Sequence, residues 1–242
     1  PTVLDFGIAD ALLGDNPITL DSLCFGTGSG SLAVHSEADE KFAETHPNGV
    51  ASEDEEKKLR GEDADNPVIF NGGMILTDDT GRELLPSSPG VSGGAVAYTV
   101  PAENAQSITF TPVYHSGVYE YEERTVTVDE MQQGVKIATS DAGGYTLQNF
   151  AVQGRALTWQ MVPYGYAQSC ELTPQDEEYI DTNTNSYAMR SSTVDPTTGI
   201  ISCRIDYYTA DPAQVAKISE FRYLFGSGYH ADESRAVTLP LQ

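Results

Sequence analysis

The sequence predicts an all-β protein built from two tandem β-sandwich domains, with only short helices. Apolar and polar residues alternate with a period of two along many segments, as expected for strands with one buried face. Turn residues such as Gly, Pro, Asn and Asp interrupt these segments roughly every 8–12 residues, a spacing typical of sandwiches. The length of 242 residues leaves room for two domains.

In the first half, four alternating segments predict strands, and a glycine-rich turn separates the first two. The strands are expected at 18–23, 31–34, 95–100 and 107–114, with the turn at 26–30. The turn is too short for a dinucleotide-binding loop, and no helix follows it that could hold a phosphate.

In the second half, strands are expected at 124–128, 134–137, 145–152, 156–162, 200–208 and 236–239. Two short helices are expected at 173–176 and 211–214. Each has a capping residue before a proline and an acceptor side chain three positions after the cap.

The two halves resemble each other weakly but in the same order. Segment 18–23 aligns with 145–150, 97–99 with 207–209, and 107–108 with 217–218. This internal repeat indicates a duplication, with one domain over 1–116 and a second over 117–242.

The first domain carries an acidic insertion at about 36–66. Eleven acidic residues lie between Glu37 and Asp65, with almost no large apolar residue among them. Such a segment buries little surface and repels itself, so we expect a solvated insertion. An acidic docking or cation-binding arm is the alternative.

The charge balance excludes several classes of partner. Thirteen Lys and Arg face thirty-six Asp and Glu, which gives a formal charge of −23 and a pI near 4.2. A surface of this sign repels nucleic acid and anionic membranes. No apolar run approaches the roughly 18 residues that a membrane-spanning helix needs.

The three cysteines, Cys24, Cys170 and Cys203, form no C-x-x-C pair and are too few for a disulfide framework. Two interpretations stay open. Cys170 and Cys203 pair and leave Cys24 free, or all three are small buried or half-buried hydrophobic residues.

No motif predicts a catalytic residue. The string at 90–94 matches G-x-S-x-G, with Ser92 as its serine. A nucleophile elbow needs a strand before the serine and a helix after it. Here a proline-rich segment precedes Ser92 and a strand follows, so we expect a glycine-rich turn.

No cofactor or metal site is predicted either. His35, His46, His115 and His230 are scattered, and no spacing places two ligands on one element. The turns at 77–81 and 181–185 are rich in oxygen ligands but do not match an EF-hand loop, so we expect calcium binding there to be incidental at most.

Aromatic residues bear on a sugar-binding function. Trp159 lies in the middle of a strand, where burial is expected. It precedes both Cys170 and Cys203, so the Cys…Trp…Cys order of antibody domains is not met. The tyrosines that could stack on a sugar are Tyr164, Tyr166, Tyr207, Tyr208, Tyr223 and Tyr229.

Four segments, mainly in the second half, carry a family resemblance: 126–130, 144–147, 161–165 and 218–223. With them the chain resembles the extracytoplasmic part of a bacterial family of uncharacterised two-domain proteins. These are typically tethered by one membrane helix and often described as anti-sigma factors. The resemblance implies tandem immunoglobulin-like sandwiches outside the membrane that sense or bind, and it carries over no site residue.

The expected function is therefore non-enzymatic: the extracytoplasmic sensing or protein-interaction region of a bacterial envelope regulator. The chain begins at Pro1, and we expect an export signal or membrane anchor to have been removed. The partner would be a protein or a glycan, and a carbohydrate-binding or adhesin-like surface module is the alternative function. A hydrolase with Ser92 is the third.

Overall fold

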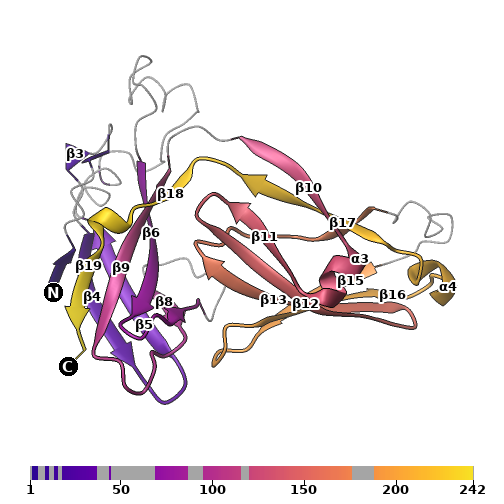
Figure 1. The fold of residues 1–242 in the computed structure, drawn as a ribbon, viewed down its shortest axis with the longest axis horizontal. Coiled ribbons are helices and arrows are strands. Elements are labelled where there is room, and N and C mark those ends of the chain that lie inside the picture. Colours follow the sequence, from indigo (N-terminus) through magenta and orange to yellow (C-terminus); the bar gives the residue numbers. More distant parts are fainter. Residues whose placement is uncertain are drawn as a thin grey trace. The chain divides into compact units, whose positions relative to one another are not determined.

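The computed structural model describes residues 2–4, 9–10, 14–15, 18–36, 44, 69–86, 95–115, 120–175 and 188–241. The chain divides into two compact units (Figure 1). Unit 1 comprises Pro1–Tyr119 and Gly228–Gln242, and unit 2 comprises Glu120–Ser227. Strands dominate both units, and the prediction of an all-β protein is confirmed. The expected insertion at 36–66 lies almost wholly outside the described residues.

Unit 1 contains two main antiparallel sheets. The first has the order β1 (Thr2–Leu4), β4 (Ile18–Phe25), β5 (Gly30–Ser36) and β8 (Ala95–Tyr98). The second has the order β18 (Tyr229–Ala231), β9 (Ser107–His115), β6 (Ile69–Asp78) and β7 (Glu83–Leu84), and β19 (Val237–Pro240) also pairs with β9. The short strands β2 (Ala9–Asp10) and β3 (Gly14–Asp15) pair with each other, and a 3-10 helix η3 spans Glu233–Arg235.

The C-terminal residues correct the expected domain limits of 117–242. Strand β18 pairs with β9 from Tyr229 to Ala231, and β19 pairs with β9 from Val237 to Pro240. The physical reason is burial. Val237 and Leu239 pack against the apolar core of unit 1, whose centre includes the fully buried Phe110. The last fifteen residues therefore belong to unit 1 and not to the second domain.

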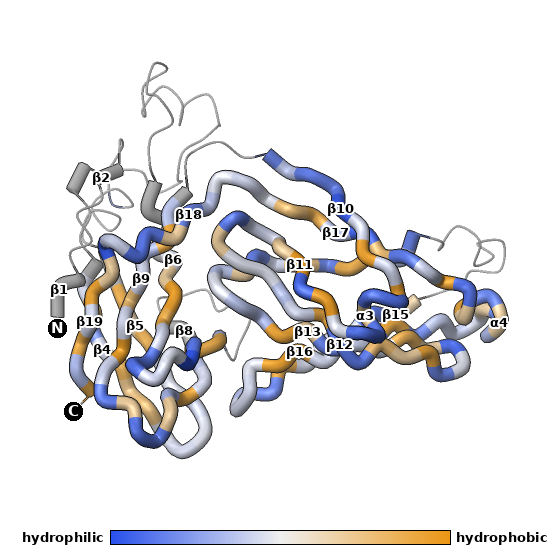
Figure 2. Tube along the Cα trace, in the orientation of Figure 1, coloured by the Kyte–Doolittle hydropathy of each residue, from blue (hydrophilic) through white to orange (hydrophobic). Residues whose placement is uncertain are grey.

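Unit 2 is organised around one eight-stranded sheet. The strands are β10 (Tyr121–Thr127), β11 (Val135–Ser140), β12 (Gly143–Gln153), β13 (Ala156–Gly165), β14 (Thr173–Pro174), β15 (Ala188–Val194), β16 (Ile201–Tyr207) and β17 (Glu220–Gly226). Their order is β10-β17-β11-β12-β13-β16-β15, with β14 beside β17. Apolar and polar stretches alternate along the chain in both units (Figure 2).

Two short helices lie in the described part of unit 2. Helix α4 (Pro212–Val215) begins where expected, because the Asp211 side chain accepts a hydrogen bond from the Ala213 N–H at 2.9 Å. Helix α3 (Val128–Gln133) was not expected. Thr127 and Glu130 form a capping box at its start, in which each side chain accepts from the other's backbone N–H. The helix expected at 173–176 is wrong, because Thr173 and Pro174 form β14 against β17.

The core of unit 2 centres on aromatic contacts between β17 and the strands β12 and β13. Phe221 is fully buried, and its ring centroid lies 5.8 Å from that of Phe150 and 5.6 Å from that of Trp159. Trp159 is 6% exposed, which confirms its expected burial. Aromatic pairs at these separations add packing energy beyond the area that they bury.

In unit 1, the carboxylate of Asp78 organises the turn after β6. Its Oδ1 accepts from the Thr80 N–H, the Thr80 hydroxyl and the Arg82 N–H, and its Oδ2 accepts from the Ala102 N–H at 2.8 Å. Burial alone would raise the pKa of Asp78, but these hydrogen bonds outweigh it and lower the pKa. Both carboxylate oxygens of Asp78, in the oxygen-rich turn at 77–81, thus accept hydrogen bonds from the protein.

We predict that Asp78→Asn lowers the free energy of unfolding by about 1–3 kcal/mol at pH 7, because an amide nitrogen cannot accept from the backbone donors. A carboxyl whose pKa is lowered on folding stabilises the protein above its unfolded-state pKa and loses that contribution as the pH falls through the folded value. The deficit should therefore shrink at acid pH. Urea unfolding at several pH values measures it, with Glu103→Gln as the exposed control. An equal deficit at every pH would contradict this account.

Candidate functional site

The candidate site lies at the end of the unit 2 sheet where β13, β16 and β15 run side by side. Trp159 pairs with Cys203, which pairs with Ser192. Residues directly opposite in an antiparallel pair project to the same face, and neighbours along a strand project to opposite faces. These three residues therefore share the core-facing side of the sheet. The next row, which contains Thr158, Arg204 and Ser191, shares the other side.

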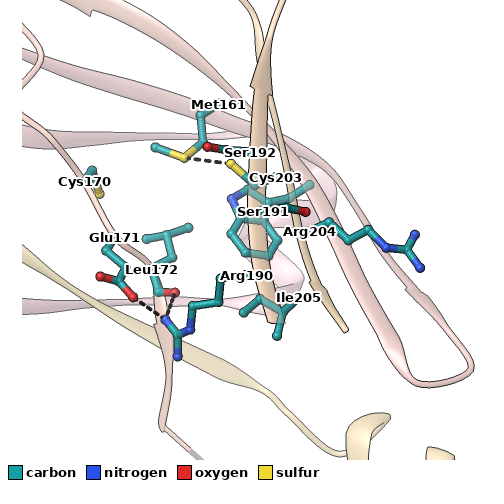
Figure 3. A pocket seen from close by; sticks show the side chains of 11 residues that line it. Met161, Cys170, Glu171, Leu172, Arg190, Ser191, Ser192, Cys203, Arg204 and Ile205 are labelled. Carbon is teal, nitrogen blue, oxygen red and sulfur yellow. Dashed lines mark hydrogen bonds and ion pairs between the residues drawn. The ribbon is translucent and has the colours of Figure 1, made fainter. Parts of the chain in front are cut away.

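The core-facing side has a cavity of about 190 Å³, here called the inner hollow (Figure 3). Its apolar wall consists of Trp159, Met161, Leu172 and Ile205. The remaining lining residues are Cys170, Glu171, Arg190, Ser191, Ser192, Cys203 and Arg204.

An ion pair spans the inner hollow from β15 to the segment before β14. Nη1 of Arg190 lies 2.7 Å from Oε1 of Glu171, and it also donates to the carbonyl of Leu172 at 3.4 Å (Figure 3). The two side chains are 32% and 73% exposed. Because solvent screens an exposed pair, it holds the two segments together only weakly.

The other side of the sheet carries a second cavity of about 410 Å³, here called the outer hollow. Amide and hydroxyl side chains dominate its lining: Asn149, Thr158, Gln160, Ser191, Thr193 and Ser202. Oε1 of Gln160 accepts from Nδ2 of Asn149 at 2.7 Å. Asn149 has a φ of 56°, a left-handed conformation that asparagine tolerates, at the register shift of β12 against β13.

Arg204 is the charged residue of the outer hollow, and its side chain is bound by Asp206 on the same strand. Its Nε and Nη2 donate to the two carboxylate oxygens of Asp206, both at 2.6 Å. Hydrogen bonding and charge from Asp206 raise the pKa of Arg204, and hydrogen bonding from Arg204 lowers the pKa of Asp206. The pair therefore stays fully ionised, and the two charges cancel.

Trp159 lines both hollows and carries an unmet hydrogen-bonding group. Its indole N–H is buried and has no partner among the residues that the structure describes. An indole nitrogen is a donor only, and a buried donor without an acceptor is destabilising.

Cys170 and Cys203 both line the inner hollow and are free thiols, as is the exposed Cys24. Burial, with smaller contributions from Cys203 and Glu171, raises the pKa of Cys170 to about 12, and burial raises that of Cys203 to about 11. Sγ of Cys203 lies 3.5 Å from Sδ of Met161. These thiols are protonated at neutral pH and are therefore poor nucleophiles.

The other residues singled out in the sequence do not converge on the hollows. Ser92, His46 and the turn at 181–185 lie outside the described residues. His35 and His115 belong to β5 and β9 of unit 1, and His230 stacks on Tyr114 at 5.6 Å. Within the described part of the chain, no three His, Cys, Asp or Glu side chains group as metal ligands.

The expected sugar-stacking tyrosines do not gather on one surface. Tyr207 and Tyr223 are buried, and Tyr164, Tyr166 and Tyr229 are half-buried. The most exposed tyrosines of the described residues are Tyr121 on β10 and Tyr208 after β16, which lie at opposite ends of the strand order.

The sequence analysis missed β15, which supplies Arg190, Ser191 and Ser192 to the hollows. A run of small polar residues ending in Thr193 and Val194 gives only a weak period-two signal. The hydroxyl and β-branched content of 188–194 is the sole local indication of a strand.

Comparison of the chain with protein-family models, with curated proteins and with solved structures finds no match. Among the described residues, no helix has the length and apolar character to span a membrane.

We predict that iodoacetamide at pH 8 labels Cys24 first and leaves Cys170 and Cys203 largely unmodified. With a pKa of about 11, only roughly one Cys203 thiol in a thousand is ionised at that pH. Peptide mass spectrometry over time measures the labelling, and urea-unfolded protein, in which all three should react alike, is the control. Equal native rates at the three cysteines would contradict the geometry.

We predict that Trp159→Phe lowers the free energy of unfolding by about 1 kcal/mol, whereas Trp159→Ala lowers it by about 3–5 kcal/mol. Phenylalanine keeps most of the packing against Phe221 and removes the unmet donor. Denaturant unfolding of both variants gives the comparison. A Phe variant as unstable as the Ala variant would mean that the indole N–H makes a strong hydrogen bond after all.

Proposed function

We propose that this chain is a non-enzymatic, extracytoplasmic protein-interaction region of a bacterial envelope regulator, anti-sigma-factor-like, which binds a partner by strand addition to β15. The observation that carries the proposal is the open edge of β15. Among the strands that the structure describes, β15 pairs only with β16 and ends the sheet.

Strand β15 has the properties of an edge that accepts another strand. It runs for seven residues in unbroken register with β16, and its side chains are exposed or half-exposed. It contains no proline and one charged residue, Arg190. An edge strand presents backbone N–H and C=O groups, and proteins commonly protect such edges with charges, prolines or bulges. Strand addition uses these groups for affinity.

The opposite edge of the same sheet provides the contrast. Strand β10 carries three consecutive charged residues, Glu122, Glu123 and Arg124, and Arg124 bonds to Glu122 at 2.7 Å. Charged side chains on an edge oppose pairing with another chain. Of the two described ends of this sheet, the β15 edge is therefore the better suited to strand addition.

The chemistry of the hollows supports binding over catalysis. Nucleophilic catalysis needs a thiolate or a hydroxyl activated by a base. Here the two thiols are held protonated, and the described lining contains no histidine. Among the described lining residues the one carboxylate, that of Glu171, is largely exposed and paired with Arg190, and neither thiol is activated.

We further propose that the two units are duplicated immunoglobulin-like sandwiches. The strand order β1-β4-β5-β8 parallels β11-β12-β13-β16. The sequence repeat aligns Leu20 with Leu147, and the cross-strand partners of these two residues, Val34 and Met161, are separated by the same number of residues. Shortly after these positions, the register of both strand pairs shifts. In the structure, the strand pairing makes Tyr98 correspond to Ile205, whereas the sequence repeat aligns Tyr98 with Tyr208.

A glycan-binding module is the second candidate, and the outer hollow favours it. Its amide and hydroxyl side chains are of the kind that hydrogen-bond sugar hydroxyls. The scattered tyrosines, by contrast, offer no stacking platform among the described residues.

The test blocks β15 with proline. Alternate residues of an edge strand direct their N–H groups to the neighbouring strand and to the open side. Of Ser191→Pro and Ser192→Pro, we therefore expect one to keep the stability of the wild type and to lose its partner. The full chain and Ser191→Thr, the control, should capture the same protein from a bacterial envelope extract, identified by mass spectrometry.

Two results would contradict strand addition. Capture of the same protein by the stable proline variant would show that β15 is not the interface. A rise in melting temperature with one class of glycan or peptidoglycan fragment, unchanged by the proline, would favour the glycan-binding alternative.

A further inference from the structure

We propose that the segment added to β15 is an extended, net-positive stretch of the partner protein that inserts an apolar side chain into the inner hollow. This inference rests on the proposed function and specifies the chemistry of the occupant.

Both hollows border the same strand, on opposite faces. Arg190 lines the inner hollow alone, Thr193 lines the outer hollow alone, and Ser191 and Ser192 between them line both. A strand added beside β15 lies about 4.8 Å away, and its successive side chains alternate between the faces. Every second side chain of the added strand is therefore directed towards the inner hollow, and the side chains between them towards the outer hollow.

The inner hollow suits an apolar side chain. Trp159, Met161, Leu172 and Ile205 form its wall, and about 190 Å³ is enough for one aliphatic side chain. The exposed ion pair between Arg190 and Glu171 crosses it, and a solvent-screened pair of this kind is easily displaced. The outer hollow, lined by amides and hydroxyls, suits a polar neighbour such as threonine.

The charge of the chain further favours a net-positive segment as the occupant. The chain carries a formal charge of −23, so its field attracts a cationic segment. The positive charges beside β15 are balanced locally, because Arg190 pairs with Glu171 and Arg204 pairs with Asp206. Glu171 has a side chain that is 73% exposed, and it can accept a hydrogen bond from an incoming lysine or arginine.

The same arguments disfavour a second copy of this chain. Two chains of −23 repel each other. A net-positive segment of a partner meets no such repulsion.

Synthetic seven-residue peptides test the proposal on the full chain. The lead peptide alternates threonine with leucine between terminal lysines, capped at both ends (K-T-L-T-L-T-K). Three relatives replace leucine with serine, replace lysine with glutamate, or carry N-methyl groups on all internal backbone nitrogens. Trp159 is the one tryptophan of the chain and lines the hollow, so its fluorescence reports binding directly.

We expect the leucine peptide to shift Trp159 emission and to bind at least tenfold more tightly than the serine peptide. The glutamate peptide should bind more weakly, increasingly so at low salt. Ser192→Phe fills the inner hollow from an exposed position and should abolish the preference for leucine. Thr193→Phe, on the other face of β15 and outside the lining of the inner hollow, is the matched control and should retain it.

The other outcomes separate this inference from the proposed function. Equal binding of the leucine and serine peptides, with loss on N-methylation, would overturn the role of the inner hollow and leave strand addition standing. Undiminished binding of the N-methylated peptide would overturn both. Equal binding of the lysine and glutamate peptides would overturn the charge selection. Failure of every peptide would overturn this inference, and the proline variants would then decide the function alone.

Discussion

The packing of Phe221 against Phe150 and Trp159 is the contact on which the rest of unit 2 depends. It connects β17, beside one end of the strand order, to β12 and β13 in the middle. Trp159 is held in place by this contact and is also a wall of both hollows. The same residue thus belongs to the core and to the candidate site.

The sheet edges of the two units are protected to different degrees, and the proposed function depends on this difference. In unit 1, the last residues of the chain return to cover β9, and Val237 and Leu239 add to its core. In unit 2, β10 is protected by Glu122, Glu123 and Arg124, whereas β15 has no described strand on its outer side and no run of charges. Backbone groups left open along a regular strand are costly unless water or another chain satisfies them. We therefore take β15 as the interaction edge.

Sequence reasoning located ten of the nineteen described strands, because period-two alternation is a local signal of burial on one face. It did not locate the long strand β6 or the core strand β17. It also located Asp211 as the cap of α4. It missed α3, although Thr127 and Glu130 carry a capping-box pattern, because the preceding alternation suggested that the strand continued to Val128. It missed β15, because exposed serines give no periodic signal. A threonine before a proline predicted a helix at 173–176, but pairing with β17 overrode that local preference.

By itself, the sequence determined the strand-rich class, the charge of −23, the burial of Trp159 and the weak repeat between the halves. Each of these follows from composition or from neighbours along the chain. Only the tertiary structure decided that β19 completes unit 1 and that Trp159, Cys203 and Ser192 share one face beside an open edge. These facts depend on pairings between residues far apart in the chain. Such pairings are chosen by the total apolar surface buried and the backbone groups satisfied, which no local pattern encodes.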